Sequence, residues 1–306
     1  MELLTNVLAA TVVAGTPLLL VALGELVCER SGVLNLGQEG MMLMGAVAGF
    51  VAALSSGSLI VGVAAAILAG IAMSLLFAFM AVTLAANQYA AGLALTIFGT
   101  GLSAFLGAGF VGQSIVGFTR VAIPLLSEIP VIGRVLFDQD PLVYLSLMVF
   151  AGVAIFLRST RGGLLLRAVG EDPEAANANG LKVLVVRYLA VAFGGGMAGL
   201  SGAYLSLAYT PLWTENMTAG RGWIALALVV FATWRPERVL LGAYLFGAAS
   251  ILHLVLQGLG WKSPTELLAM LPYLVTILML VLLSWNPART RLNTPLSLGQ
   301  PFRPGR

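Results

Sequence analysis

Long apolar stretches, separated by short polar segments, run along almost the whole chain. Their approximate bounds are 3–24, 41–56, 58–84, 90–112, 142–157, 183–208, 221–234, 239–259 and 267–285. An apolar run of about 18 or more residues is typical of a transmembrane helix. The pattern predicts an all-α polytopic membrane protein with about 8–10 transmembrane helices, formed as a single transmembrane domain over residues 1–285.

The polar segments between these runs differ in character. The link at 28–40, CERSGVLNLGQEG, is punctuated by glycine, and the 28–56 and 209–234 regions are each compatible with a broken or re-entrant helix. The segment at about 113–140 mixes charged residues with prolines, which indicates a folded external loop. The tail at 286–306 is rich in arginine and proline and is predicted to be an extended surface segment on the cytoplasmic side.

The longest charged interruption, at about 158–187, contains a short predicted helix over PEAANAN with a signal at each end. Asp172 suits the N-cap, Pro173 the first helical position, and Gly180 the left-handed stop. About two turns of helix are marginal alone in water, so this helix needs a partner or flanking structure. Composition alone fits a docking element and an ordinary cytoplasmic loop equally well.

Basic residues orient the predicted bundle. Eleven of the sixteen lie in the 158–187 segment, at Arg235 and Arg238, and in the tail. Arginine and lysine concentrate on the cytoplasmic side of membrane proteins, which places all three regions inside the cell. Nine spans then put the N-terminus outside, and the protein is predicted to be a multi-pass protein of the cell (plasma or inner) membrane.

Composition excludes several classes of function. The chain is 59% hydrophobic and 9% charged, with a mean hydropathy of +0.98, so we expect it to be embedded in membrane lipid. Its net charge of +3 gives no reason to expect nucleic-acid binding. A single cysteine, Cys28, excludes an internal disulfide and a cysteine metal cluster. Neither lysine follows a glycine as a phosphate-binding GxxxxGK[ST] loop requires. We therefore expect no enzyme, no catalytic residues, no cofactor and no metal site.

Polar residues within or between the spans are candidates for a solute path, because burying them in lipid is costly. The candidates are Asn35, Gln38, Glu39, Asn87, Gln88 and Gln257. Their neutral amides favour an uncharged, hydroxyl-rich solute, although each could equally lie at a water interface or bond another helix. Two small-residue pairs, Gly45 with Gly49 and Gly195 with Gly199, predict close helix packing.

Four ordered segments resemble one family of membrane proteins. They are GELVCERSGVLNLGQEGMMLMGA at 24–46, NQYAAGLALTIFGTGLSAFLG at 87–107, RAVGEDPEAANANG at 167–180 and GRGWIALALVVFATWRPERVLLGAYLFG at 220–247. They resemble permeases of ATP-binding-cassette importers in the branched-chain amino acid and ribose superfamily, and most closely its nucleoside and simple-sugar subgroup. Cys28 and Tyr89 depart from the pattern of that subgroup, which leaves the details of the substrate open.

The resemblance implies the fold of a type II importer permease that has no ATPase activity of its own. It also implies three partners: a cassette ATPase subunit, a second related permease that completes a heterodimer, and an extracellular solute-binding lipoprotein. The segment that couples the permease to the ATPase would comprise Gly170, Glu171, Asp172, Pro173, Glu174, Ala175, Ala176 and Gly180. The solute implied is a nucleoside or, failing that, a simple sugar, moved inward by alternating access.

Other classes of function remain open from the residues. An ion-coupled secondary transporter would need a membrane-embedded ionisable relay, for which Glu39 and His253 are the candidates. A branched-chain amino acid permease would share the superfamily but carry a different solute. A structural subunit that moves no solute would also account for the sparse polar residues.

Overall fold

The computed structural model describes residues 2–258, 270, 274, 277–278, 281 and 293–303 of the 306-residue chain. Its helices are α1 Glu2–Arg30, α2 Gln38–Ser56, α3 Leu59–Ala78, α4 Gln88–Gly107, α5 Ile132–Leu136, α6 Pro141–Ser159, α7 Arg161–Glu171, α8 Pro173–Ala178, α9 Val183–Tyr204, α10 Arg221–Phe231 and α11 Pro236–Gly258. Short π-helical turns extend α3 over Phe79–Thr83 and α9 over Leu205–Tyr209, and a 3-10 turn at Ala108–Phe110 follows α4. The strands β1 Val121–Ala122 and β2 Asp138–Gln139 pair antiparallel, with Val121 opposite Gln139.

Within the described residues, seven helices are long and apolar enough to cross a membrane, which confirms the predicted fold class. They are α1, α2, α3, α4, α6, α9 and α11, with α3, α4 and α9 including their short terminal turns. The run predicted at 221–234 forms only the 11 residues of α10. At 1.5 Å per residue this helix covers about 17 Å, roughly half the hydrocarbon core of a bilayer, so it is too short to cross the core alone. The run predicted at 267–285 lies almost entirely outside the described residues.

The first predicted span is too short. α1 has 29 residues and continues past Gly24 to Arg30, so Glu25, Cys28 and Glu29 are buried within a helix instead of lying at the start of a polar link. Leucine, glutamate and arginine are good helix formers, and a buried carboxyl group is tolerated where tertiary partners bond it. The non-helical link is confined to 31–37.

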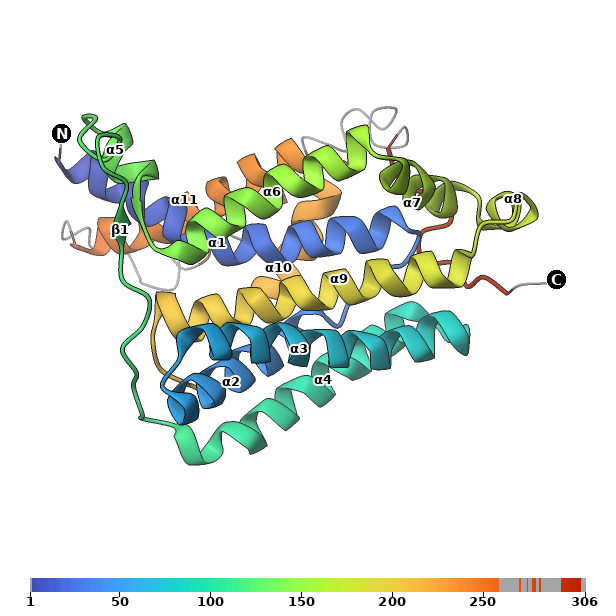
Figure 1. Cartoon of the computed structure of the whole chain (residues 1–306), viewed down its shortest axis with the longest axis horizontal. Helices are drawn as coiled ribbons and strands as arrows, with labels where there is room; N and C mark the ends of the chain where they lie inside the picture. The colour runs from blue at the N-terminus through green and yellow to red at the C-terminus, as the bar shows by residue number, and fades with distance from the viewer. Residues whose placement is uncertain are drawn as a thin grey trace.

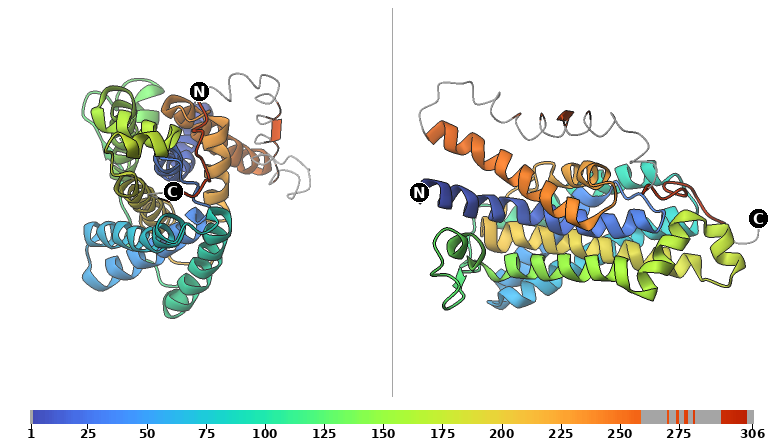
Figure 2. Two further views of the ribbon diagram at one scale, coloured as in Figure 1. Left: turned by 90° about the vertical axis from the view of Figure 1, so that its right-hand side faces the viewer. Right: turned by 90° about the horizontal axis from the view of Figure 1, so that it is seen from above.

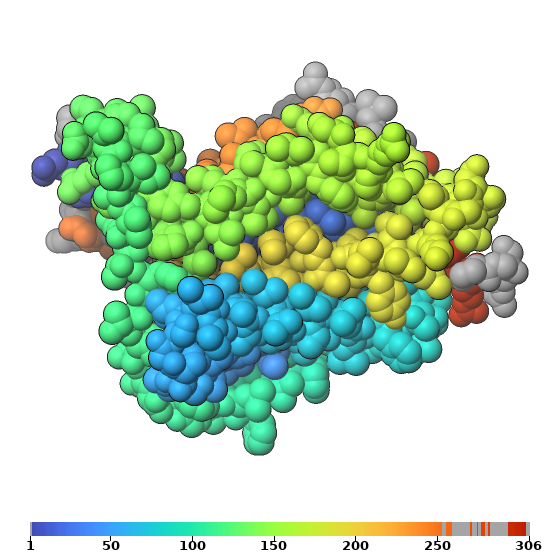
Figure 3. Space-filling model, in the orientation of Figure 1, coloured from blue at the N-terminus to red at the C-terminus, as the bar shows by residue number. Residues whose placement is uncertain are grey.

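The long helices run side by side along the longest axis of the molecule (Figure 1). α9 lies in the middle and packs against α1, α2 and α3, while α11 packs along α1 and α4 along α2. The N-terminus, α5 and β1 lie at one end of the bundle, and α8 and the C-terminus lie at the other (Figures 1 and 2). We call the latter the α8 end. In the space-filling view, α8 projects from it at the right-hand edge (Figure 3).

The 113–140 segment is folded, as its composition predicted. It contains α5 and both strands, and it is tied to the end of α9 by backbone hydrogen bonds from Ile115 to Pro211 (3.0 Å) and from Phe118 to Leu207 (2.9 Å). The segment therefore forms an ordered structure at the end of the bundle opposite α8 (Figure 1).

Glycines allow α2, α3 and α9 to approach one another closely, which confirms the packing expected from the two small-residue pairs. A Cβ atom built on Gly45 would overlap the backbone of Gly199, and one built on Gly199 would overlap the carbonyl oxygen of Ala66. Gly195 lies equally close to the backbone of Gly70. Because backbone atoms cannot rotate away as a side chain can, these positions accept only glycine without moving a helix.

We expect Gly199→Ala to destabilise the protein by about 1–3 kcal/mol, because the added methyl group forces α9 away from α3. The matched control is Gly101→Ala in α4, where an added Cβ atom has no neighbour within 4 Å. Thermal unfolding of both purified variants in the same detergent measures the difference. Equal melting temperatures for the two variants would contradict the close contact.

Candidate functional site

The short helix α8 has the ends that its sequence predicted. Asp172 Oδ1 accepts hydrogen bonds from the backbone N–H groups of Glu174 (3.0 Å) and Ala175 (2.9 Å), and Pro173 is the first helical residue. Gly180, just beyond the helix, has a φ of +83°, the left-handed conformation that glycine adopts freely. Asp172 is therefore the cap of α8, and its carboxylate is occupied in that role.

α8 has one face in water and one face anchored to the bundle. Glu171 and Glu174 are exposed, as are Asp172 and Ala175, whereas Ala176 is buried. Ala176 belongs to a small apolar cluster with Val169, Val183 and Phe302. The exposed side of the helix carries Glu174, and the acids Glu171 and Asp172 are exposed just before it. The anchored side connects the helix to α7, α9 and the C-terminal residues.

Gly170 brings the end of α7 against the end of α1. A Cβ atom at this position would overlap the carbonyl oxygen of Arg30. The Gly170 carbonyl accepts two hydrogen bonds from Ser297, one from its backbone N–H (3.0 Å) and one from its hydroxyl group (2.7 Å). Gly170 is thus a close-packing position. The end of α7 contacts the start of the 31–37 link, and α8 begins only three residues after Gly170.

Residues 293–303, which we call the C-terminal strap, lie across the α8 end. The sequence predicted a surface segment, and Gln300 and Pro301 are indeed exposed, but Ser297 and Phe302 are buried anchors. Burial follows because each anchor has a partner in the bundle: Phe302 lies in the apolar cluster of α8, and the Ser297 hydroxyl group bonds Gly170.

Arg187 of α9 holds the strap to the link between α1 and α2. Its side chain is only 1% exposed. Its guanidinium donates to the Ser31 carbonyl (3.2 Å), the Gln300 carbonyl (3.3 Å) and the Ser297 hydroxyl group (3.2 Å). It also lies over the Phe302 ring, 5.9 Å from the ring centre. The sequence identified Arg187 only as a marker of the cytoplasmic side.

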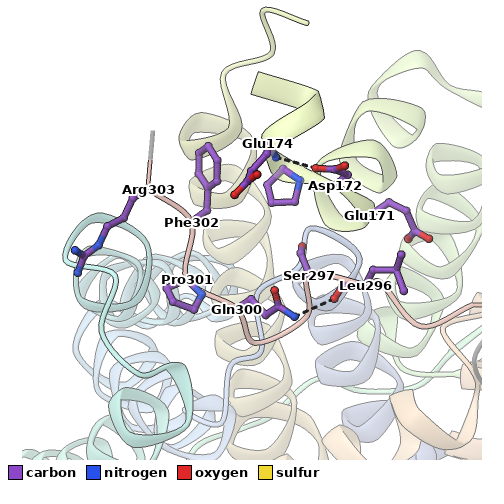
Figure 4. A pocket seen from close by; sticks show the side chains of 10 residues that line it. Glu171, Asp172, Glu174, Leu296, Ser297, Gln300, Pro301, Phe302 and Arg303 are labelled. Atoms are coloured by element: carbon purple, nitrogen blue, oxygen red, sulfur yellow. Dashed lines mark hydrogen bonds between the residues drawn. The ribbon is translucent and has the colours of Figure 1, made fainter. Parts of the chain in front are cut away.

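A cavity of about 540 Å³ opens between the α7–α8 junction and the strap (Figure 4). Its lining residues are Glu171, Asp172, Pro173, Glu174, Leu296, Ser297, Gln300, Pro301, Phe302 and Arg303. Acidic side chains come from the helical side, and the strap contributes apolar groups together with Arg303. The surface around α8 is therefore built from two distant parts of the sequence.

Inside the bundle, the 31–37 link is held by Glu25 of α1. Its two carboxylate oxygens accept hydrogen bonds from the Asn35 backbone N–H (3.0 Å) and from the Gln38 side-chain amide. The Asn35 side-chain oxygen in turn accepts from the Gly37 backbone N–H (2.9 Å). All three polar side chains are buried. Glu25 and Asn35 thereby satisfy backbone N–H groups that have no helical partner, as non-helical backbone within a membrane requires.

Glu39, in the first turn of α2, binds the N-terminal end of α10. One carboxylate oxygen accepts from the Gly220 backbone N–H (2.8 Å) and from the Thr218 hydroxyl group, and the other accepts from the Gly222 backbone N–H (2.6 Å). The first N–H groups of a helix lack partners in the helix and carry partial positive charge, so a carboxylate stabilises them. Glu39 thereby connects the two broken segments of the chain.

The other three predicted path residues, Gln88, Asn87 and Gln257, differ in where they lie. Gln88, at the start of α4, accepts from the Leu34 backbone N–H (2.8 Å) and donates to the Gln300 carbonyl (3.4 Å), so it joins the link to the strap. Asn87 is exposed and caps α4 by accepting from the Ala90 backbone N–H (3.0 Å). Gln257 is half-buried near the end of α11 and has no hydrogen bond to the other five candidates. Asn35, Gln38, Glu39 and Gln88 surround the link, whereas Asn87 lies on the surface and Gln257 stands apart.

Sequence reasoning missed the buried acids of α1. Glu29 accepts a hydrogen bond from the Trp234 indole N–H (2.5 Å), and Arg30 donates to the Trp234 carbonyl (2.7 Å), which attaches α1 to the turn between α10 and α11. The four-residue spacing of Glu25 and Glu29 places both on one face of a helix and could have indicated that the first helix continues. The side chain of His253 lies outside the described part of the chain.

We expect Glu39→Gln to destabilise the protein by about 2 kcal/mol, because an amide would turn its own N–H₂ group toward one of the α10 donors. The diagnostic measurement is hydrogen exchange, which should become faster at the backbone amides of Gly220 and Gly222. Glu128→Gln, at an exposed acid of the 113–140 segment, is the matched control. Unchanged exchange at the start of α10 would show that Glu39 does not hold this helix.

Sequence comparisons identify a family of transport proteins. The family described as "Branched-chain amino acid transport system / permease component" matches residues 7–280. The chain is 43% identical to "Putative glucose ABC transporter permease protein TsgC13" of Haloferax volcanii, with 99% of this chain and 98% of the relative covered. It is 34% identical to the guanosine ABC transporter permease protein NupQ of Bacillus subtilis (91% and 92% covered) and 32% identical to the nucleoside ABC transporter permease protein NupC of Lactococcus lactis subsp. cremoris (90% and 91% covered).

No solved structure matches the chain significantly. The family match covers most of the sequence, and each of the three relatives aligns over at least nine-tenths of both chains. The chain therefore belongs to the family of permease components of branched-chain amino acid transport systems.

Proposed function

We propose that this chain is the transmembrane permease subunit of an ABC importer and moves a neutral solute inward by alternating access. A separate cassette ATPase would dock on α8 and drive the change. The observation that carries the proposal is the exposed acidic surface of Glu171, Asp172 and Glu174 at the start of α8, a helix anchored on its other side to the bundle. The three relatives described above are named ABC transporter permeases. ATP hydrolysis belongs to the partner in this proposal.

The α8 end is the cytoplasmic end in this proposal. Arg158, Arg161, Arg235 and Arg303, which are among the basic residues that predicted this orientation, lie at or beside it, and Arg30 lies there as well. The excess of arginine and lysine on one side supports a cytoplasmic location. The folded 113–140 segment at the opposite end would then face the solute-binding lipoprotein outside the cell.

Contacts behind α8 provide a route by which docking could affect the membrane spans. Ala176 packs in one cluster with Phe302, Gly170 touches the end of α1, and Arg187 joins the strap to Ser31. Displacement of α8 would therefore act on the 31–37 link. Glu39 extends the same connection to α10. Such a chain of contacts is a physical basis for coupling, provided that the ATPase binds one conformation more tightly than the other.

The solute path is proposed to pass the two broken segments that Glu39 connects. Asn35, Gln38, Glu39 and Gln88 would shape this region by holding the link, because their polar groups already bond the chain itself. Asn87 and Gln257 would lie toward the two ends of such a path. Broken helices are where transporters commonly place their solutes.

The substrate is proposed to be a nucleoside or a simple sugar. The names of the relatives assign glucose to one of them, guanosine to another and nucleosides to a third. These solutes are neutral and rich in hydroxyl groups, which agrees with the amides and hydroxyl groups around the broken segments. A second related permease is proposed to complete a heterodimer around the path.

We expect Glu174→Lys to reduce the amount of ATPase subunit that co-purifies with the tagged permease at least five-fold and to uncouple ATP hydrolysis from uptake. The change reverses charge on the exposed face of α8 without removing the Asp172 cap. Glu128→Lys, which makes the same change at the opposite end, is the control. Recovery of wild-type amounts of ATPase with both variants would contradict docking at α8, and the wild-type sample reports whether a second permease is present.

Uptake by the intact complex should be competed by purine nucleosides or by glucose, and leucine at the same concentration should have no effect. The physical reason is that the buried polar groups near the broken segments match neutral hydroxylated solutes. Among the described residues there, no free pair of opposite charges is available for the ammonium and carboxylate groups of an amino acid. Competition by leucine alone would reassign the chain to branched-chain amino acids. Uptake that survives ATP depletion and stops with an uncoupler would favour an ion-coupled secondary transporter.

A further inference from the structure

A second polar pocket, separate from the cavity beside α8, lies at the same end of the bundle. It has a volume of about 320 Å³ and lies between the ends of α1 and α6, the helix α7, the turn between α10 and α11, and the strap. Its lining residues are Arg30, Leu157, Arg158, Arg167, Trp234, Arg235, Pro236, Glu237 and Asn293. Four of these residues are arginines and one is an acid.

The charge in this pocket is unbalanced. Glu237 pairs with Arg158 at 2.7 Å, and this is the one ion pair found among the described residues. Arg30, Arg167 and Arg235 therefore form no ion pair in the described part of the chain, and Glu171, which does not line the pocket, acts on Arg30 only at longer range. Like charges held in one pocket of reduced dielectric repel one another. A bound anion would remove that repulsion.

Arg30 is fixed in place before any ligand binds. Its two terminal nitrogens donate to the Trp234 carbonyl (2.7 Å) and to the Asn293 carbonyl (3.2 Å), while its Nε atom is buried without a hydrogen-bond partner. Arg167 uses only Nε, which donates to the Gly163 carbonyl (3.3 Å), and Arg235 is exposed with no hydrogen bond from its guanidinium to another described residue. Several N–H donors therefore remain available around the pocket.

We propose that this pocket binds the phosphate group of an anionic ligand. Planar guanidinium groups match phosphate oxygens in pairs of parallel hydrogen bonds, and several arginines together can hold one phosphate. The pocket lies where α1 and α6 end and α11 begins, which is the level at which lipid headgroups meet a membrane protein. Basic pockets between transmembrane helices on the cytoplasmic side are typical sites for anionic headgroups. The phosphate comes from such a lipid or from inorganic phosphate in solution.

Occupancy has a structural consequence. The same pocket joins α1, through Arg30, to the α10–α11 turn, through Trp234, and to the strap, through Asn293. A phosphate shared by Arg30, Arg167 and Arg235 would fasten α7 to these three elements. The site therefore stabilises the end of the bundle that carries α8, independently of which solute the protein moves.

The test uses the purified full-length chain in lipid nanodiscs and follows its melting temperature. One arm replaces neutral phosphatidylcholine by phosphatidylglycerol, and the other adds inorganic phosphate to phosphatidylcholine nanodiscs at constant ionic strength. We expect a rise of about 3 °C in at least one arm. A rise only with phosphatidylglycerol identifies a lipid headgroup as the ligand, and a rise with inorganic phosphate identifies a site for free phosphate.

Variants locate the effect. Arg167→Gln combined with Arg235→Gln should abolish the rise, whereas Arg161→Gln, at an exposed arginine on α7 outside the pocket, should keep it. If the double variant does not fold, Arg235→Gln alone, at an exposed side chain, should reduce the rise by at least half. No rise in either arm, or an equal rise in the pocket variants, overturns the proposal. Loss of co-purified ATPase in the pocket variants without any anion effect would assign these arginines to a protein partner instead.

Discussion

Non-helical backbone inside a membrane bundle must find its hydrogen bonds within the protein, and this constraint organises the structure around two glutamates. Glu25 accepts from the Asn35 backbone N–H in the 31–37 link and from the Gln38 side chain at the start of α2, and Glu39 accepts from the free N–H groups at the start of α10. Without these acceptors, both breaks would leave buried donors unpaired, at a cost of about 1–3 kcal/mol for each group. The breaks therefore exist because the carboxylates are there to support them.

Close contacts between buried groups hold the α8 end of the bundle together. Gly170 lets α7 touch the end of α1, and Arg187 gathers Ser31, Ser297 and the Gln300 carbonyl around one guanidinium. The acidic surface at the start of α8 can therefore be presented to a partner while the other face of the helix is fixed. A helix of about two turns would not hold its shape without such support.

Two basic features at this end have different characters. Arg187 is buried, and its three donor nitrogens all have acceptors, so it serves the packing of the strap. The arginines around Trp234 are less buried, and three of them form no ion pair in the described residues. Arginine thus has two roles at this end: Arg187 holds the strap in place, whereas the arginines around Trp234 leave a pocket that an anion can occupy.

Much of the local structure could be predicted from the sequence. The apolar runs located the membrane helices, and the capping residues Asp172, Pro173 and Gly180 located α8, because both depend on neighbouring residues alone. The boundary of α1 could not be predicted from hydrophobicity, since Glu25 and Glu29 are polar but buried.

The roles of individual site residues could not be predicted from the sequence either, because they depend on contacts between distant segments. Glu39 was recognisable as an unusual acid in a broken segment, but its partners lie about 180 residues away along the chain. The strap offered no signal that Ser297 and Phe302 would be buried. The sequence by itself determined where seven of the long apolar helices lie, the short charged helix and the family resemblance, because these follow from local pattern. Only the tertiary structure decided which acids hold the breaks, what anchors α8 and where the arginines converge, because hydrogen bonds and burial depend on contacts between distant segments.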